Sequence, residues 1–117
     1  MAIIPAEIKQ AWENRNGAVV FATVDAEGMP NAIYATCVNM LDDESVAVCD
    51  NFFNKTRANI LSGSKGAIVF ITKEGKAYQF KGAIEYVTEG PIFEEMKGWV
   101  KDTLPREAVA VLKVEAV

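Results

Sequence analysis

Histidine is absent from the 117 residues of this chain. Its absence excludes Ser-His-Asp and Cys-His catalysis, and it excludes the zinc sites that depend on imidazole ligands. Cysteine is scarce, because only Cys37 and Cys49 occur, and both lie within apolar segments. We therefore expect two buried free thiols and no framework of disulfide bonds.

The sequence also lacks a long apolar run and an excess of basic residues. No apolar segment approaches the roughly 20 residues that a membrane-spanning helix needs, and no N-terminal segment has the pattern of a secretory signal. The formal net charge is −4. Neither nucleic acid nor an anionic membrane is expected as the main partner, because both require a basic face. These features favour a cytoplasmic protein.

Apolar side chains are abundant and make up 50% of the sequence. A chain of this length is expected to form a single domain, here residues 1–117, that buries about two-thirds of its unfolded surface. The apolar content is larger than one such core absorbs. We expect the surplus to contact a partner chain or an apolar ligand.

The spacing of the apolar residues predicts a mainly β protein with a few short helices. Helices are expected over residues 5–15, from about Thr56 to Ser62, and within residues 89–105. Strands are expected over residues 18–24, 31–40, 45–50, 65–72, 77–87 and 106–117. Several strands are apolar on both faces and require cover on both sides. Six such antiparallel strands favour a small barrel with helices or a second subunit on part of its outside.

The segment Asp50–Ile60 gathers cations and polar side chains at a strand-to-helix junction. If the helix begins near Thr56, Lys55 and the Thr56 hydroxyl lie beside unpaired backbone N–H groups, where a phosphate monoester is favoured. Arg57 would add a further cation. The alternative is that Thr56 caps the helix while Lys55 and Arg57 extend into solvent. These residues alone leave both interpretations open.

Lys55 and Thr56, followed by Asn59 and Ile60, carry a resemblance to a known family. Together with the strand pattern around residues 31–40 and the final helix-then-strand order, they resemble the flavin-binding split-barrel superfamily of pyridoxamine 5'-phosphate oxidase and the small FMN-binding proteins. The resemblance covers essentially the whole chain and implies a six-stranded antiparallel split barrel with short flanking helices. It also implies an FMN cofactor in a groove at a homodimer interface.

The resemblance assigns roles to eight residues. It places Lys55 and Thr56 on the phosphate of FMN. It places the second strand against the isoalloxazine ring and the end of the third strand near the ribityl chain or the ring edge. The strand residues are Ile33, Tyr34, Ala35 and Thr36, and those at the end of the third strand are Asp50 and Asn51. Trp99 or Gln79 of the second subunit are candidates to complete the site.

Only part of the second strand can meet the ring through its side chains. Tyr34 and Thr36 share one face of the strand, whereas Ile33 and Ala35 share the opposite one. The other residues can contribute backbone groups. For Tyr34, the alternative is an ordinary half-buried strand aromatic.

The expected function is that of a dimeric FMN protein, either an electron carrier or a small flavin oxidoreductase. Its redox partner would be a nicotinamide cofactor or an electron-transfer protein. No residue is assigned as a catalytic acid, base or nucleophile, and none as a metal ligand. Pyridoxamine 5'-phosphate oxidases are longer and bind the substrate phosphate with additional Arg and His residues near the C-terminus. Here Arg106 is the only arginine after Arg57 and there is no histidine, so the resemblance does not imply oxidase activity on pyridoxamine phosphate.

Two alternatives belong to other functional classes. The first is a non-catalytic barrel that binds a phosphate-bearing ligand. The second is a reductase of the same fold that uses the deazaflavin F420, whose polyanionic tail requires additional lysines and arginines around the groove.

Overall fold

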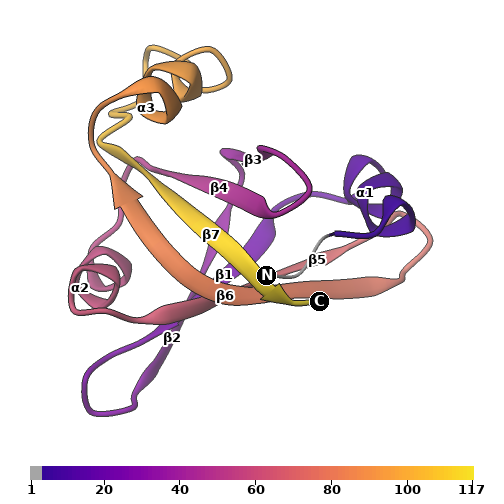
Figure 1. The fold of residues 1–117 in the computed structure, drawn as a ribbon, viewed down its shortest axis with the longest axis horizontal. Helices are drawn as coiled ribbons and strands as arrows, with labels where there is room; N and C mark the ends of the chain where they lie inside the picture. Colours follow the sequence, from indigo (N-terminus) through magenta and orange to yellow (C-terminus); the bar gives the residue numbers. More distant parts are fainter. Residues whose placement is uncertain (1–3) are drawn as a thin grey trace.

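Residues 4–117 form a single curled antiparallel sheet with three short helices around it (Figure 1). The computed structural model describes residues 4–117. The elements, in chain order, are α1 (Ala6–Glu13), β1 (Val19–Val24), β2 (Pro30–Ala35), β3 (Val38–Met40), β4 (Ser45–Asp50), α2 (Lys55–Leu61), β5 (Lys65–Ile71), β6 (Ala77–Val87), α3 (Pro91–Met96) and β7 (Ala108–Ala116). The strand order in the sheet is β2-β1-β5-β6-β7-β4-β3. The prediction of a mainly β antiparallel split barrel is confirmed.

The join between β2 and β3 explains why the sheet closes on itself. These two strands lie at opposite edges of the sheet, yet only Thr36 and Cys37 separate them along the chain. The sheet must therefore curl until its two edges almost meet. At the join, the N–H of Val38 donates to the carbonyl of Thr36 over 3.1 Å. The single strand expected over residues 31–40 is thus two strands, which corrects the predicted count from six strands to seven within residues 4–117.

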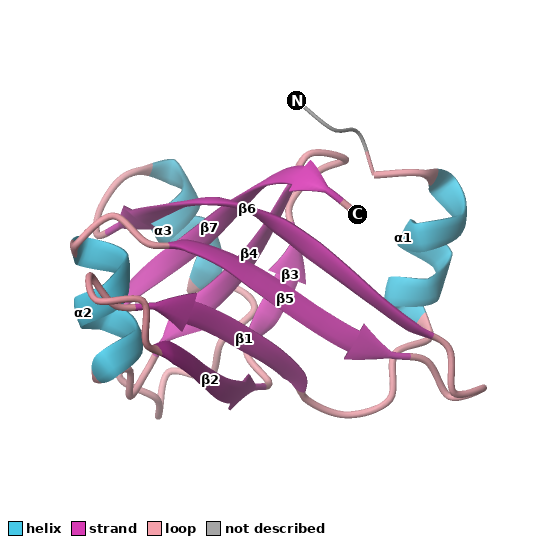
Figure 2. Cartoon of the chain, turned by 90° about the horizontal axis from the view of Figure 1, so that it is seen from below, coloured by secondary structure: helices cyan, strands magenta, loops and turns pink. Residues whose placement is uncertain are grey.

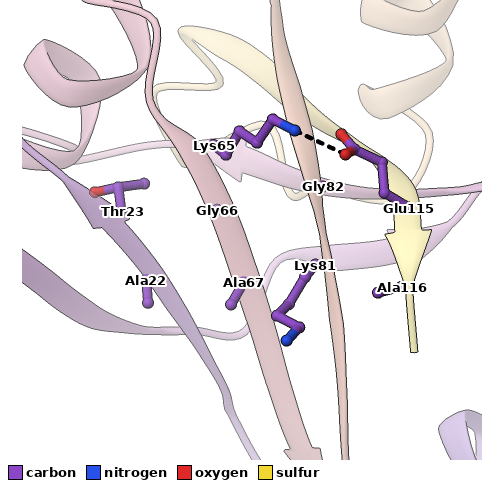
Figure 3. A pocket seen from close by; sticks show the side chains of 9 residues that line it. All are labelled: Ala22, Thr23, Lys65, Gly66, Ala67, Lys81, Gly82, Glu115 and Ala116. Atoms are coloured by element: carbon purple, nitrogen blue, oxygen red, sulfur yellow. Dashed lines mark hydrogen bonds and ion pairs between the residues drawn. The ribbon is translucent and has the colours of Figure 1, made fainter.

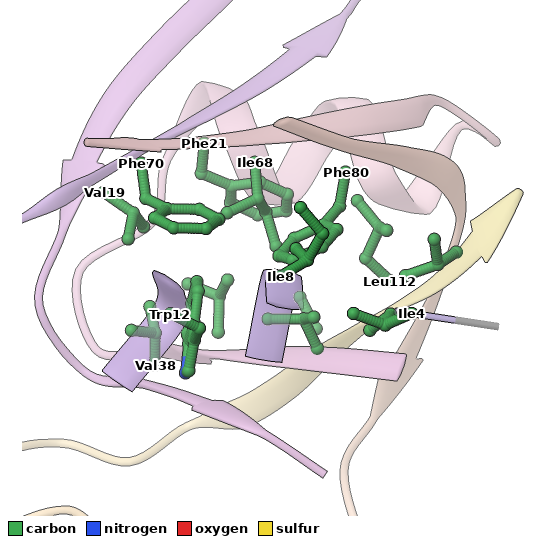
Figure 4. Close-up of a cluster of buried hydrophobic side chains, with 14 of the residues drawn as sticks. Ile4, Ile8, Trp12, Val19, Phe21, Val38, Ile68, Phe70, Phe80 and Leu112 are labelled. Carbon is green, nitrogen blue, oxygen red and sulfur yellow. The ribbon is translucent and has the colours of Figure 1, made fainter. Parts of the chain in front are cut away.

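The barrel interior is filled by aromatic and branched side chains from β1, β5, β6 and β7 (Figure 4). Helix α1 closes one end of the barrel by burying Ile8 and Trp12. The Trp12 ring meets Phe70 edge-on at a centroid distance of 5.2 Å and lies 5.9 Å from Phe80. Within residues 4–117, no helix has the length and apolar character that crossing a membrane requires.

The outward side of β4 and β7 is covered by helix α3 and the turn after it. We call this the covered face; it consists of Ala47, Cys49, Val109 and Val111, with Met96 and Val100 packed on them. Helix α3 ends at Met96, earlier than its apolar spacing suggested. Beyond it the chain continues in tighter turns, where Gly98 N–H bonds to Glu95 and Trp99 N–H to Met96.

The outward side of β2, β1 and β5 differs, because Figure 2 shows these strands side by side with α2 and α1 at their two ends and no described helix over them. We call it the open face; it consists of Val20, Ala22, Val24, Ala32, Tyr34, Ala67, Val69 and Ile71. All eight are partly or largely exposed, as for Ile71 at 44%. The cover expected on both sides of these strands is therefore not supplied by residues 4–117.

Candidate functional site

Five of the eight predicted site residues line one pocket, at the point where β2 ends and β4 leads into α2. The cavity measures about 340 Å³. We call it the β2 pocket; its lining is Ile33, Tyr34, Ala35, Thr36, Cys37, Cys49, Asn51, Phe52, Phe53 and Leu104. Most of these side chains are apolar. A pocket of this kind suits a flat, largely apolar group with few polar contacts.

Two aromatic side chains of the β2 pocket extend into solvent. Tyr34 is 80% exposed and Phe52 is 76% exposed. The sequence interpretation included Tyr34 and missed Phe52, although an aromatic residue in a turn between two asparagines is an unusual place for an apolar side chain. Exposed aromatic rings beside an apolar pocket are suited to contact a planar ligand or another protein chain.

Strand β2 also offers backbone hydrogen-bonding groups, because β1 is its only neighbouring strand among residues 4–117. At the hairpin, the Asp25 N–H donates to the Met29 carbonyl oxygen. From this pair onward, hydrogen-bonded and non-hydrogen-bonded residue pairs alternate along β1 and β2. In that register Ile33 and Ala35 exchange hydrogen bonds with β1, whereas the N–H and C=O groups of Tyr34 point toward the open edge. The pocket thus has both a donor and an acceptor at its wall.

Lys55 lies at the other end of β2, in a groove of about 310 Å³. The groove is lined by Asp25, Met29, Pro30, Asn31, Lys55, Ala58 and Asn59. At the rise of a β-strand, Asn31 and Ala35 are about 13 Å apart. The predicted phosphate end and the predicted ring end of the site therefore lie along the same strand, in two separate cavities.

Thr56 is buried beside this groove, with only 1% of its surface exposed. Its hydroxyl oxygen accepts a hydrogen bond from Asn31 Nδ2 at 3.0 Å. Helix α2 begins at Lys55 after Asn54 and has no side-chain cap, so Thr56 does not have the capping role that was the alternative interpretation. A hydroxyl that accepts one hydrogen bond can also donate one.

Asp50 is fully buried, at the centre of a polar cluster. Its carboxylate accepts hydrogen bonds from Arg57 at 2.7 and 3.0 Å, from the Tyr86 hydroxyl at 2.5 Å, and from the Phe53 N–H at 2.9 Å. Because the carboxylate has no exposed surface, Asp50 would not contact a ligand directly. It would affect a ligand only by positioning Arg57. Arg57 is thereby held in one orientation instead of extending freely into solvent.

The charges in this cluster shift each other's protonation. Burial by itself raises the pKa of Asp50, but the hydrogen bonds from Arg57, Tyr86 and the Phe53 N–H outweigh it, so the pKa lies below its ordinary value. Burial and the bond to Asp50 raise the pKa of Tyr86 to about 12. Arg57 and Asp50 are therefore both charged at neutral pH. Sequence reasoning missed Tyr86, because nothing along the chain indicates that β6 brings it to Asp50.

Trp99, a candidate contributed by the second subunit, lies next to the β2 pocket of its own chain. It lines a cavity of about 460 Å³ that shares Thr36, Cys37 and Leu104 with that pocket. Its indole Nε1 is buried and has no hydrogen-bond partner among the described residues. Indole N–H groups usually find an acceptor when they are buried.

A further hollow lies where β1, β5, β6 and β7 run side by side (Figure 3). Its wall includes Gly66 and Gly82, which face each other in register, and Lys65 forms an ion pair with Glu115 at 2.8 Å across its rim. A Cβ atom on Gly82 would collide with the carbonyl oxygen of Lys113. None of the eight predicted site residues lines this hollow.

Comparisons with known proteins agree with the fold. The family model described as pyridoxamine 5'-phosphate oxidase matches residues 4–117. MJ0282, an uncharacterized protein of Methanocaldococcus jannaschii, is 35% identical over 107 residues, which cover 87% of this chain and 72% of that protein. The crystal structure of HupZ from Group A Streptococcus is 33% identical with a TM-score of 0.83, and the match covers 97% of this chain and 90% of that chain.

More distant structures share the fold alone. An FMN-binding protein from Syntrophomonas wolfei is 19% identical with a TM-score of 0.71, over 90% of this chain and 78% of that chain. HutZ, a heme storage protein from Vibrio cholerae, is 20% identical with a TM-score of 0.73, over 99% and 93%. An F420 reductase is 15% identical with a TM-score of 0.73, over 97% of both chains.

The fold, the family match and the relatives at or above 30% identity lead to one conclusion. The family model spans nearly the whole chain, and MJ0282 and HupZ both align with most of it. This chain belongs to the pyridoxamine 5'-phosphate oxidase family.

Proposed function

We propose that this protein binds FMN along β2 and acts in redox chemistry, as an electron carrier or a small flavin oxidoreductase. The observation that carries the proposal is the β2 pocket, where the exposed rings of Tyr34 and Phe52 stand beside unpaired backbone groups of an edge strand. An isoalloxazine ring requires a flat, largely apolar slot with a few polar groups at its edge. When bound, FMN supplies the electron and hydride transfer.

The groove at the start of α2 supports a phosphate at the other end of the ligand. Lys55 is exposed and lines the groove with a full positive charge, and Asn31 and the Thr56 hydroxyl lie beside it. Lys55 and Thr56 would hold the phosphate. Arg57 lies two residues after Lys55 in α2, where Asp50 fixes its position and pairs with its charge.

Ile33, Ala35 and Thr36 would border the ring, and Asn51 would approach the ring edge or the ribityl chain. The side chain of Asn51 is already engaged, since its Oδ1 accepts the Arg106 N–H at 3.0 Å. Its remaining amide N–H₂ group is a donor, which suits a ribityl hydroxyl or a ring carbonyl.

A homodimer would complete this site. The open face is apolar over three strands and lacks cover from residues 4–117. Gln79 lies opposite Val69 in the ladder and is exposed, so a second copy docked on this face would contact it. The proposed electron donor is a cytoplasmic nicotinamide cofactor or an electron-transfer protein.

The structure favours FMN over the other cofactors found among proteins of this fold. Among the residues lining the groove, Lys55 is the one cation, whereas the polyanionic tail of F420 requires several. The axial histidine that holds heme in globins and peroxidases is missing, because the chain has no histidine. A non-catalytic barrel would still bind a phosphate-bearing ligand at Lys55, and it would do so without reduction by a nicotinamide.

The test is a binding titration of the purified full chain with FMN and with riboflavin, which lacks the phosphate. We expect Lys55→Ala to weaken FMN binding about tenfold or more, because a charged hydrogen bond contributes about 1.5–3 kcal/mol. Riboflavin affinity should stay unchanged. Lys73→Ala, at an exposed lysine of the β5–β6 turn, is the matched control.

Three outcomes would contradict the proposal. Equal losses of affinity for FMN and for riboflavin would show that Lys55 does not bind the phosphate. A chain that binds no flavin at all would remove the cofactor assignment. A bound flavin that no nicotinamide or protein donor reduces would support the non-catalytic barrel.

A further inference from the structure

Cys37 and Cys49 lie opposite each other on neighbouring stretches of chain, in the wall of the β2 pocket. The ladder pairs Val38 with Val48, so the next pair along is Cys37 with Cys49. The N–H of Cys49 donates to the carbonyl oxygen of Cys37 at 2.9 Å, which makes this a hydrogen-bonded position. Opposed residues at such a position have Cα atoms about 5.5 Å apart, a separation typical of disulfide-bonded cysteines.

The two side chains share one environment. Both belong to the apolar cluster of the covered face, and both line the β2 pocket. Both are free thiols. Opposed residues of an antiparallel pair place their side chains on the same face of the sheet. The backbone thus holds the two thiols on the same face of neighbouring chain segments.

Their accessibility differs, which gives them different chemical roles. Cys49 is only 4% exposed, and its Sγ–H donates to Asn51 Oδ1 at 3.5 Å. Burial, together with the neighbouring Cys37 and Asp50, raises the pKa of Cys49 to about 12. Cys37 is half-buried and lines both the β2 pocket and the cavity beside Trp99. A reagent in solution therefore meets Cys37 first.

We propose that Cys37 and Cys49 form a reversible dithiol–disulfide centre that exchanges two electrons with small aliphatic disulfides. The thiolate of Cys37 attacks one sulfur of the small disulfide, which breaks the sulfur–sulfur bond and releases one thiol. The mixed disulfide on Cys37 is then attacked by the Cys49 sulfur, whose proton leaves with the second released thiol. Two protein thiols are oxidised to one disulfide, and one small disulfide is reduced to two thiols.

This centre needs no bound flavin, so its test is independent of the FMN proposal. The reduced full chain is equilibrated without oxygen in glutathione buffers of increasing disulfide fraction, quenched with acid, alkylated, and weighed intact. We expect the protein to lose two hydrogens without retaining glutathione, and added thiol to restore them. Trypsin leaves both cysteines within residues 16–55, so cleavage in the acidic turn at residues 42–44 is needed to show the bond.

Single variants separate the two roles. Cys49→Ser should trap one glutathione on Cys37, because the resolving sulfur is gone. Cys37→Ser should leave the buried Cys49 unmodified over the same time. Circular dichroism checks that each variant is folded. If a variant does not fold, the wild-type mass and fragment analysis decide the question by themselves.

The proposal is overturned if the folded wild-type chain keeps both thiols at the highest disulfide fraction. It is also overturned if the chain accumulates glutathione adducts without an internal bond, or if it forms disulfides only between two molecules. Equal labelling of Cys49 in Cys37→Ser and of Cys37 in Cys49→Ser would contradict the assigned order of attack.

Discussion

The covered face and the open face belong to the same curled sheet, yet they treat their apolar side chains differently. On β4 and β7, outward residues such as Ala47 and Val109 are fully buried, because Met96 and Val100 pack on them. On β1 and β5, outward residues such as Val24 and Ile71 remain more than a third exposed. Since apolar exposure of this kind often marks an interaction site, the comparison indicates which side of the barrel is available to a ligand or partner.

Two polar contacts at other places in the sheet also differ in their burial. Asp50, at the end of β4, is fully buried and receives three donor groups. The ion pair of Lys65 and Glu115, at the rim of the hollow in Figure 3, lies between side chains that are 70% and 45% exposed. A buried, fully hydrogen-bonded group holds chain segments together, whereas an exposed ion pair contributes little.

The largest expected difference in stability is between a residue that packs on the covered face and a residue of the open face. Met96→Ala should lower the free energy of unfolding by about 2–5 kcal/mol, because Met96 is fully buried and its truncation leaves a cavity. Val69→Ala, on the open face, should cost less than about 1 kcal/mol in the monomer, since it removes partly exposed methyl groups. Urea denaturation at low protein concentration measures both. Similar losses would show that the two faces are equivalent.

The next effect concerns the polar contacts. Asp50→Ala should lower the free energy of unfolding by about 3 kcal/mol, because Arg57, Tyr86 and the Phe53 N–H lose their common acceptor. Glu115→Ala is the matched control and should lower the free energy of unfolding far less, because its ion pair with Lys65 is exposed. A loss at Glu115 as large as that at Asp50 would show that burial does not distinguish the two contacts.

The same cluster gives the Asp50 variant a second readout, in its dependence on pH. The pKa of Asp50 is lower in the folded chain than its ordinary value of about 3.9. The unfolded chain therefore binds this proton first as the pH falls. The contribution of Asp50 is present above about pH 4 and is lost as the pH falls through the lower folded pKa. Asp50→Asn should make the free energy of unfolding depend less on pH in this range. A variant with the same pH dependence as the wild type would contradict the argument.

A charge on the open face should have only a small effect on the folding of a single chain. Val69→Asp should cost the monomer about 1 kcal/mol, which is the span of strand preferences. It should nevertheless convert the proposed dimer to a monomer, because a second copy would bury the carboxylate. Light scattering measures the change, and Val117→Asp, at an exposed valine near the end of the sheet, is the control. A Val69→Asp protein that stays dimeric would place the interface elsewhere.

Much of the fold could be predicted because its signals are local. The spacing of Ile8 and Trp12 predicted α1, and the two β-branched runs around the turn at residues 73–76 predicted the β5–β6 hairpin. The junction at Lys55 also followed from neighbouring residues, and α2 begins there. The end of α3 did not follow, because Met96, Trp99 and Val100 keep a helical spacing while the chain turns more tightly after Met96.

The candidate site could be predicted only in part, because its members come from distant segments. Ile33 to Thr36 and Asn51 were expected together, and they line one pocket. The hydrogen bond between Asp50 and Tyr86 joins residues 36 positions apart, and no local sequence pattern predicts it. Phe52 was missed because an exposed aromatic residue in a turn can be recognised as part of a pocket only when the structure shows that a strand lies beside it.

The sequence by itself determined the order and type of most elements and placed a cation at the strand-to-helix junction, because helix and strand preferences depend on residues a few positions apart. Tertiary structure alone decided that the chain crosses from one sheet edge to the other between Thr36 and Cys37, and which face α3 covers. These features depend on pairings between distant segments, whose free energy arises only when the sheet curls and its edges approach.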